Sequence, residues 1–238
     1  MKRFLAAVFA GAMALTALTG CEDIFNPPVE EESSSRMERV SSSVIDPAII
    51  GTWKNDVSGY IFGENRKVSL PMDFTASAHF NKDGSFTAEG IEISKDEVEF
   101  DGTNLKVTHD FGGDEESSES EEDTVLLDMT RKGSADKSSF DGTYKLSGGS
   151  YLEMIADNLG IDYDKIDVEA EIDGENFRIT VVDYCLYETL GDSLELFSEN
   201  MQYVDENANA VKYTYKIDGD TLTLTYATGE TEVLTKAE

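Results

Sequence analysis

Apolar and polar residues alternate with a period of two along most of the chain after residue 74, which is the pattern of strands with one buried face. The segments 98–107, 168–181 and 211–226 each hold two alternating runs separated by an Asp-Gly step. An Asp-Gly step is a strong hairpin signal, because Gly accepts the positive φ that tight hairpin turns require. The sequence therefore predicts an all-β, mainly antiparallel fold built from hairpins.

The chain starts this pattern twice. GTWK at 51–54 and GTYK at 142–145 are the same four residues with one aromatic exchanged for another. Each is followed by Asp-Gly hairpins and by a closing strand, at 124–132 and at 231–236. Repetition of this kind indicates duplication of a structural unit. The two copies form either two separate domains or one larger sheet with shared strands.

Two segments of the second repeat depart from the alternation and favour short helices, which the first repeat lacks. The first segment places Leu152 and Ile155 on one stripe, and Ser150 with Glu153 fits a capping box. The second segment, 191–201, also has apolar residues at helical spacing. Such helices either cover an open barrel end or complete a core that short strands leave unfilled.

The first 20 residues have the composition of a secretory signal. Lys2 and Arg3 precede an apolar run that ends in small residues. The sequence LTGC at 18–21 resembles the lipobox of bacterial lipoproteins, and this resemblance implies cleavage before Cys21 and acylation of its thiol. The alternatives are an ordinary signal peptide with a chance cysteine, or an uncleaved membrane helix.

The segment after Cys21 is acidic, rich in Ser and too polar to build a core, so we expect a flexible tether. The predicted organisation, in chain order, is a signal peptide at 1–20, a lipidated cysteine and tether at 21–46, a first β-domain at 47–133, a linker at 134–139, and a second β-domain with helical insertions at 140–238.

A second resemblance concerns the β-domains. The GTWK and GTYK starts, NLGID at 158–162 and YKIDGDTLTLTY at 215–226 resemble the lipocalin-like domains in lipoproteins of gut-type bacteria, within the wider calycin group. The resemblance spans about residues 48–238. It implies two tandem small lipocalin-like β-barrels, closed or half-closed, and binding of a small apolar molecule.

Charge narrows the range of partners. The 238 residues include 19 basic and 49 acidic residues, which gives a formal net charge of −30. Nucleic acids and anionic lipid head groups are polyanions, and such a chain repels them. We therefore expect no nucleic-acid partner, and contact with a membrane only through the lipid on Cys21.

Catalytic and metal-binding signals are weak. The chain has none of the nucleophile-elbow, zinc-protease, paired-cysteine or phosphate-loop motifs. Cys185 stands among apolar neighbours, and only two histidines are present, so neither a nucleophile pair nor a zinc site is expected. We expect no cofactor, no metal and no enzyme activity. The alternative is an extracytoplasmic hydrolase that uses paired carboxylates.

The expected function is that of a membrane-anchored lipoprotein on the outward face of the cell envelope, which binds a small apolar ligand or a protein partner without catalysis. Tyr213, Tyr215 and Tyr226 lie in phase with apolar residues and should face a barrel interior. With Leu152 and Ile155 covering one end, they are the predicted ligand-binding residues.

Overall fold

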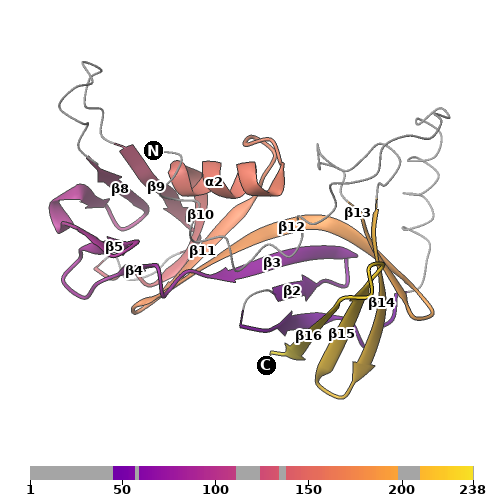
Figure 1. Ribbon diagram of the computed structural model, residues 1–238. Helices are drawn as coiled ribbons and strands as arrows, with labels where there is room; N and C mark the ends of the chain where they lie inside the picture. Colours follow the sequence, from indigo (N-terminus) through magenta and orange to yellow (C-terminus); the bar gives the residue numbers. More distant parts are fainter. Residues whose placement is uncertain (1–44, 57–58, 111–123, 134–137, 198–209, 238) are drawn as a thin grey trace. The chain divides into compact units, whose positions relative to one another are not determined.

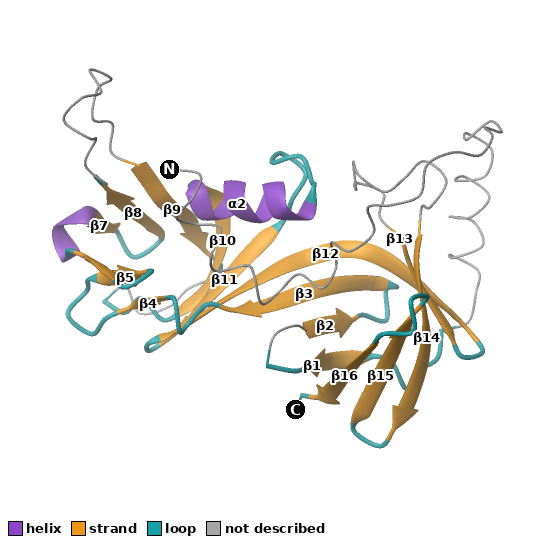
Figure 2. Ribbon diagram, in the orientation of Figure 1, coloured by secondary structure: helices purple, strands orange, loops and turns teal. Residues whose placement is uncertain are grey.

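The computed structural model describes residues 45–56, 59–110, 124–133, 138–197 and 210–237 (Figure 1). Antiparallel strands with few helices make up the described chain (Figure 2), so the all-β prediction is confirmed. Cys21, the predicted signal peptide and most of the tether lie outside the described residues. Among those described, the helices are all too short or too polar to cross a membrane.

The chain forms two compact units that are interleaved in sequence. Unit 1 contains the described residues up to Leu70 and those from Asp183 onward, and unit 2 is Pro71–Val182. This division differs from the tandem domains predicted at 47–133 and 140–238. Unit 2 is inserted into unit 1, so each unit takes strands from both sequence repeats.

Unit 1 is a closed antiparallel barrel of eight strands. Following the sheet around the ring, the order is β12, β13, β14, β15, β16, β1, β2 and β3, and β3 neighbours β12 again. Apart from the insertion after β3, each strand pairs with the next one in the chain, and β16 returns to pair with β1. The strands are β1 (Gly51–Lys54), β2 (Gly59–Phe62), β3 (Lys67–Asp73), β12 (Asn176–Leu190), β13 (Ser193–Phe197), β14 (Ala210–Asp218), β15 (Thr221–Tyr226) and β16 (Thr231–Lys236).

Strand β12 belongs to both units, and its crossing point has a special backbone. Its 15 residues start in unit 2 and end in unit 1. Asp183, the first residue on the unit 1 side, has a φ of 51°. Asp tolerates this left-handed conformation better than most residues do. Here the Asp183 amide donates to Ser69 Oγ at 3.0 Å, and its carboxylate pairs with Lys67 at 2.7 Å.

Unit 2 is also built from antiparallel strands. Strands β7 to β11 and the first part of β12 pair in sequence order, and β4, β5 and β6 form a small separate sheet. The elements are β4 (Ala78–Phe80), β5 (Phe86–Ala88), β6 (Ile91–Ile93), the 3₁₀ helix η3 (Lys95–Glu97), β7 (Val98–Phe100), β8 (Asn104–His109), β9 (Thr124–Arg131), β10 (Gly142–Gly148), the helix α2 (Ser150–Leu159) and β11 (Val168–Asp173).

Aromatic rings fill the core of unit 2. The rings of Phe80 and Phe86 lie 4.7 Å apart, and Phe177 meets Phe86 edge to face at 5.9 Å. Phe140 contacts Phe80 at 5.3 Å. Because aromatic side chains bury large areas and prefer such tilted contacts, this cluster ties β4 and β5 to β12.

The local hairpin predictions are confirmed. Ala170 pairs with Ile179 across the turn at Gly174, and Tyr215 pairs with Leu224 across the turn at Gly219. Both turn glycines have φ near +60°, as the Asp-Gly signal requires. Alternation and turn chemistry therefore determine the register within each hairpin.

The repeats exchange their closing strands. Strand β1 of the first repeat pairs with β16 of the second, and Trp53 lies opposite Lys236. Strand β10 of the second repeat pairs with β9 of the first, and Tyr144 lies opposite Arg131. A tandem arrangement would have paired each first strand with the closing strand of its own repeat.

The predicted helix at 151–159 is present as α2, but its start differs from the prediction. Gly149 is the N-cap residue and no side chain caps the helix, so the capping box of Ser150 and Glu153 is absent. Gly149 has a φ of 99°, and a Cβ there would lie 2.4 Å from the Leu126 carbonyl oxygen. This close approach fixes the helix start at the glycine. The capping box of the described chain is instead formed by Ser94 and Glu97 at η3.

The helix predicted at 191–201 is wrong for its described part. Residues Ser193–Phe197 form strand β13, which pairs with β12 on one side and β14 on the other. Leu194 and Leu196 are both buried, two residues apart. A period of two thus prevails over the helical spacing, because both neighbouring strands supply backbone partners.

Candidate functional site

The candidate site lies inside the barrel of unit 1. Buried positions alternate along its strands, which places one side of every strand in the interior. The interior is mostly aromatic and aliphatic. The buried residues on the barrel strands include Trp53, Tyr60, Phe62, Val68, Leu70, Cys185, Tyr187, Leu194, Leu196, Tyr213, Tyr215, Leu222, Leu224 and Leu234.

One end of the barrel is closed by the segment that precedes β1. Ile49 is fully buried, and its carbonyl accepts a hydrogen bond from Trp53 Nε1 at 2.6 Å. Asp46 is held by two barrel strands, because its amide donates to Thr189 Oγ1 and its carboxylate accepts from the Tyr215 hydroxyl at 2.9 Å. These bonds fix a plug across this end.

Polar groups gather at the other end, where β1 and β15 finish and β16 begins. The carboxylate of Glu232 accepts hydrogen bonds from the hydroxyls of Tyr60 at 3.3 Å and Tyr226 at 3.1 Å, both on Oε2. Its other oxygen accepts from the side-chain amide of Asn55 at 3.3 Å. Glu232 is two residues from the buried Leu234, so it points to the interior side of β16.

Tyr213 completes this group. Its ring meets that of Tyr226 edge to face, with centroids 4.9 Å apart. The residue is 2% exposed, and its buried hydroxyl makes no well-aligned hydrogen bond with the described residues, although the hydroxyls of Tyr60 and Tyr226 lie beside it. A buried hydroxyl without a well-formed hydrogen bond costs about 1–3 kcal/mol, so this feature is unusual. We refer to Tyr60, Tyr213, Tyr226 and Glu232 as the tyrosine cluster.

Burial controls the ionisation of the tyrosine cluster. Burial, with a smaller contribution from Glu232, raises the pKa of Tyr226 to about 12. Burial also raises the pKa of Tyr213 and Tyr60 well above the ordinary value. All three hydroxyls therefore keep their protons at neutral pH, where each can both donate and accept a hydrogen bond.

The structure brings together only some of the predicted binding residues. Tyr213 and Tyr226 meet in the tyrosine cluster, whereas Tyr215 lies at the plugged end, bonded to Asp46. Leu152 and Ile155 are buried in α2, which packs against β9 and β10 of unit 2. They belong to a different unit from the tyrosines and fill its core. The predicted lipidation site, Cys21, lies outside the described residues.

Two residues of the cluster were missed by sequence reasoning. Glu232 is in phase with Leu234, and this signal was present in the alternation of 231–236. Tyr60 lies in a four-residue strand that is too short to establish a phase. Their hydroxyl and carboxylate groups meet only because β16 pairs with β1, a contact between opposite ends of the chain.

Cys185 is a packing residue rather than a nucleophile. It is buried on β12, and burial raises the pKa of its thiol to about 12. A thiol is nucleophilic only as the thiolate, which hardly forms at neutral pH with such a pKa.

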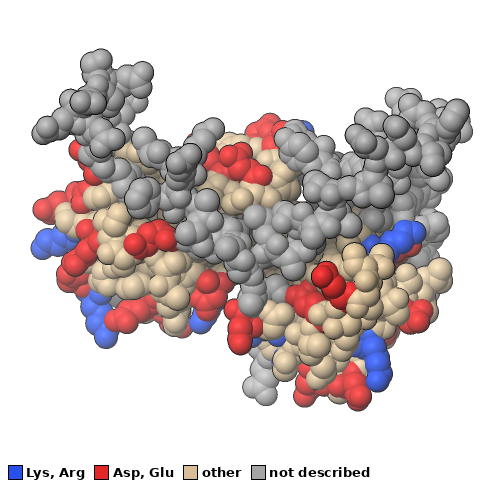
Figure 3. Space-filling view, in the orientation of Figure 1, with Lys and Arg blue, Asp and Glu red and all other residues tan. Residues whose placement is uncertain are grey.

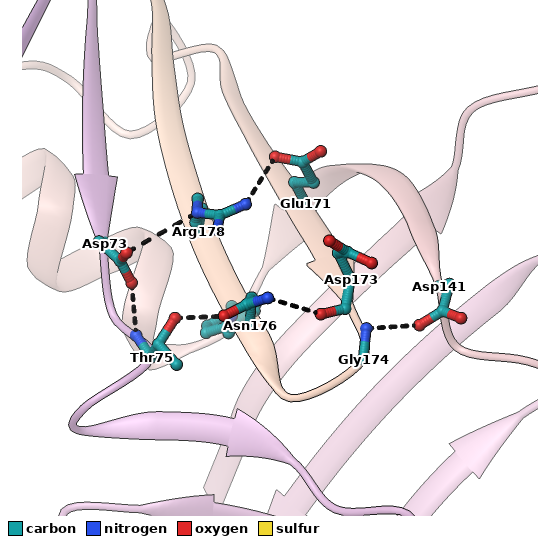
Figure 4. Close-up of polar contacts among 9 residues, drawn as sticks. Asp73, Thr75, Asp141, Glu171, Asp173, Gly174, Asn176 and Arg178 are labelled. Carbon is teal, nitrogen blue, oxygen red and sulfur yellow. Dashed lines mark hydrogen bonds and ion pairs between the residues drawn. The ribbon is translucent and has the colours of Figure 1, made fainter. Parts of the chain in front are cut away.

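The paired carboxylates most evident in the structure form a surface ladder in unit 2 (Figure 4). Arg178 bridges Asp73 at 3.7 Å and Glu171 at 3.6 Å. Thr75 accepts a hydrogen bond from the Phe177 amide, and Asp141 accepts one from the Gly174 amide. The side chains of Asp73 and Glu171 are more than half exposed, so the ladder fastens the β11–β12 hairpin at the surface instead of building a buried acid–base pair.

Acidic side chains are also scattered over the face drawn in Figure 3, where basic side chains are fewer. This agrees with the net charge of −30. A dispersed negative surface favours cations over anions near any opening of the protein.

No protein-family model matches this chain, and neither a curated protein nor a solved structure matches it. Function is therefore inferred from the chemistry of the site.

Proposed function

We propose that the protein is a lipid-anchored, extracytoplasmic binding protein whose unit 1 barrel holds a small, mainly apolar molecule. The observation that carries this proposal is the buried hydroxyl of Tyr213, which lies inside an apolar barrel without a well-aligned hydrogen bond to the described residues. Binding sites for small molecules are mostly apolar with a few polar groups that orient the ligand. The interior of unit 1 and its tyrosine cluster have this composition.

We further propose that both units derive from one small lipocalin-like barrel. Up-and-down barrels of eight strands are typical of lipocalins, and unit 1 has this topology. Unit 2 has the same kind of opening strand, with its aromatic residue opposite a cation. In place of two tandem barrels, the duplicated chain forms two units with exchanged strands.

Binding can be followed with the single tryptophan of the chain. Trp53 is fully buried in unit 1, so a bound fluorophore in the barrel should quench it by energy transfer. We expect N-phenyl-1-naphthylamine, which is neutral at pH 7, to bind residues 22–238 saturably and to quench Trp53. Leu224→Phe, which adds volume to the interior, should weaken binding. Val233→Phe, on the exposed side of β16, is the matched control. Absence of saturable quenching would refute the barrel as a binding site.

Anchoring is tested separately. Cys21→Ala should abolish incorporation of labelled palmitate and release the protein from the detergent phase, because all the acyl chains of the proposed anchor would be attached at this cysteine. Cys185→Ala is the control and should remain lipidated. If Cys21→Ala is still labelled, lipidation at this cysteine is ruled out.

A further inference from the structure

We infer that unit 1 recognises an organic amine, whose protonated primary or secondary ammonium group sits at the tyrosine cluster while its apolar body lies in the barrel. This inference rests on the proposed function and names the ligand class for the same site.

The first argument is the pattern of acceptors. Glu232 offers a carboxylate on the interior side of β16, and the Tyr213 hydroxyl lies close enough for Glu232 and Tyr226 to influence it electrostatically. That hydroxyl makes no well-aligned hydrogen bond with the described residues, although the hydroxyls of Tyr60 and Tyr226 lie beside it. An ammonium N–H can donate to the Tyr213 oxygen and to the carboxylate together, and charge-assisted bonds of this kind are strong.

The second argument is the aromatic surround. The rings of Tyr213 and Tyr226 meet edge to face, and the Tyr60 ring lies above Phe62 in a stacked contact at 5.9 Å. Aromatic faces attract cations through their quadrupole, most strongly where water is excluded. Tyr60 and Tyr213 are both at least 97% buried, so the cluster provides such a place.

The third argument is selectivity by charge and by hydrogen bonding. An anionic ligand such as a fatty acid would place its carboxylate against Glu232, and like charges at contact distance repel strongly. A quaternary ammonium satisfies the aromatic rings but has no N–H for Tyr213. A neutral alcohol can bond to Tyr213 but gains little from the charge of Glu232.

The test uses residues 22–238 and isothermal titration calorimetry at pH 7 with three probes that share a 2-phenylethyl group. They are 2-phenylethylamine, neutral 2-phenylethanol and phenethyltrimethylammonium. We expect 2-phenylethylamine to bind most tightly. Glu232→Gln should weaken its binding roughly 10- to 100-fold, and Tyr213→Phe roughly 3- to 10-fold. Glu230→Gln, an exposed residue on the turn before β16, makes the same charge change and should have little effect.

The outcomes separate this inference from the proposed function. If the neutral naphthylamine probe binds but 2-phenylethylamine does not, or binds equally to wild type and Glu232→Gln, the amine inference fails and the binding function stands. Tighter binding of the quaternary probe would also overturn it, because Tyr213 would then have no role as acceptor. Far-UV circular dichroism of each variant establishes that it is folded, and Glu232→Asp offers a second, charge-preserving variant that should retain part of the affinity.

Discussion

Trp53 in unit 1 and Tyr144 in unit 2 occupy equivalent positions, because each lies on the first strand of its repeat opposite a cation of the paired closing strand. The polar atom of each ring donates to the carbonyl four residues earlier, Trp53 to Ile49 and Tyr144 to Phe140, both at 2.6 Å. Each ring also carries a cation from the paired closing strand, with Lys236 Nζ at 5.1 Å from one centroid and Arg131 Cζ at 5.2 Å from the other.

Glycine makes this packing feasible in both units. Gly51 and Gly142, two residues before each aromatic, have φ values of 127° and 152°. A Cβ on either glycine would lie 3.3 Å from the cation side chain that packs there. The repeated Gly-Thr-aromatic motif therefore begins a strand and also leaves space for a cation side chain from the neighbouring strand.

The difference lies in the burial of the cation. Lys236 is exposed, whereas Arg131 is buried and donates to the carbonyls of Gly102, Ser139 and Asp141 and to the Tyr144 hydroxyl. A guanidinium has five N–H donors in a fixed fork, which backbone carbonyls can satisfy, whereas a buried ammonium is harder to compensate. The same motif can thus accommodate an exposed cation, Lys236, or a buried cation that stabilises the fold, Arg131.

The largest expected effect is loss of folding when the chain is divided between the two repeats. Fragments 46–134 and 139–238 should each remain unfolded alone, because 46–134 lacks β16, the closing strand that pairs with β1, and 139–238 lacks β9, the closing strand that pairs with β10. Mixed together, they should recover strand structure. Fragment 71–182, which is unit 2, should fold without the rest. Far-UV circular dichroism and amide proton dispersion measure this. An independently folded 139–238 would mean that a repeat can close on its own closing strand.

Removing either aromatic should be the next largest effect. Trp53→Ala and Tyr144→Ala should each lower the free energy of unfolding by about 3–5 kcal/mol, because both are fully buried and leave a large cavity. Urea denaturation measures the loss. Tyr163→Ala, at an exposed position, is the control and should stay within about 0.5 kcal/mol. A cost near that of the control would show that the ring does not close its unit.

Replacing each cation by Met should destabilise the protein by different amounts at the two positions. Arg131→Met should cost about 2–4 kcal/mol, because it leaves buried carbonyls without donors. Lys236→Met should cost less than about 1 kcal/mol, since only an exposed cation–π contact is lost. Thermal and urea unfolding of both variants give the comparison. Equal losses would contradict the assignment of Arg131 as the structural cation.

Alkaline pH gives the smallest and most local test, because Tyr144 can ionise and Trp53 cannot. Burial raises the pKa of Tyr144, and the hydrogen bond from Arg131 partly opposes this rise. Its folded pKa exceeds the unfolded value of about 10, so its stabilisation is complete below that pH and is lost as pH rises through the folded pKa.

Arg131→Met removes the opposing contribution and should shift the ionisation of Tyr144 to higher pH. The measurement is absorbance at 295 nm as a difference against Tyr144→Phe in the same background. An unchanged or lower midpoint would contradict the proposed balance between burial and Arg131.

The sequence was sufficient for the hairpins but not for the pairing between repeats. Alternation and Asp-Gly turns are local signals, so registers such as Ala170 with Ile179 could be predicted. The choice of closing strand could not, because β9 ends in Met-Thr-Arg and β16 ends in Leu-Thr-Lys. Either first strand would accept either ending by local chemistry.

The site was predictable to a similar extent. Phase alone placed Tyr213 and Tyr226 on an inward face. Glu232 joins Tyr226 within the β15–β16 hairpin, and Tyr60 joins them only through the pairing of β1 with β16. Leu152 and Ile155 were assigned to the same site because their helix belongs to the second repeat, and the exchange of strands puts them in unit 2.

The insertion of unit 2 into unit 1 also determines the order in which the protein can be completed. As a chain emerges from its N-terminus, β1 to β3 appear first, yet β16 is the last strand to arrive. Unit 2 can therefore fold in the middle of an unfinished molecule, while the first three strands wait with unpaired edges that invite aggregation or proteolysis. A product that stops short of β16 would keep a folded unit 2 but an open barrel in unit 1. Closure of the barrel therefore requires synthesis through β16.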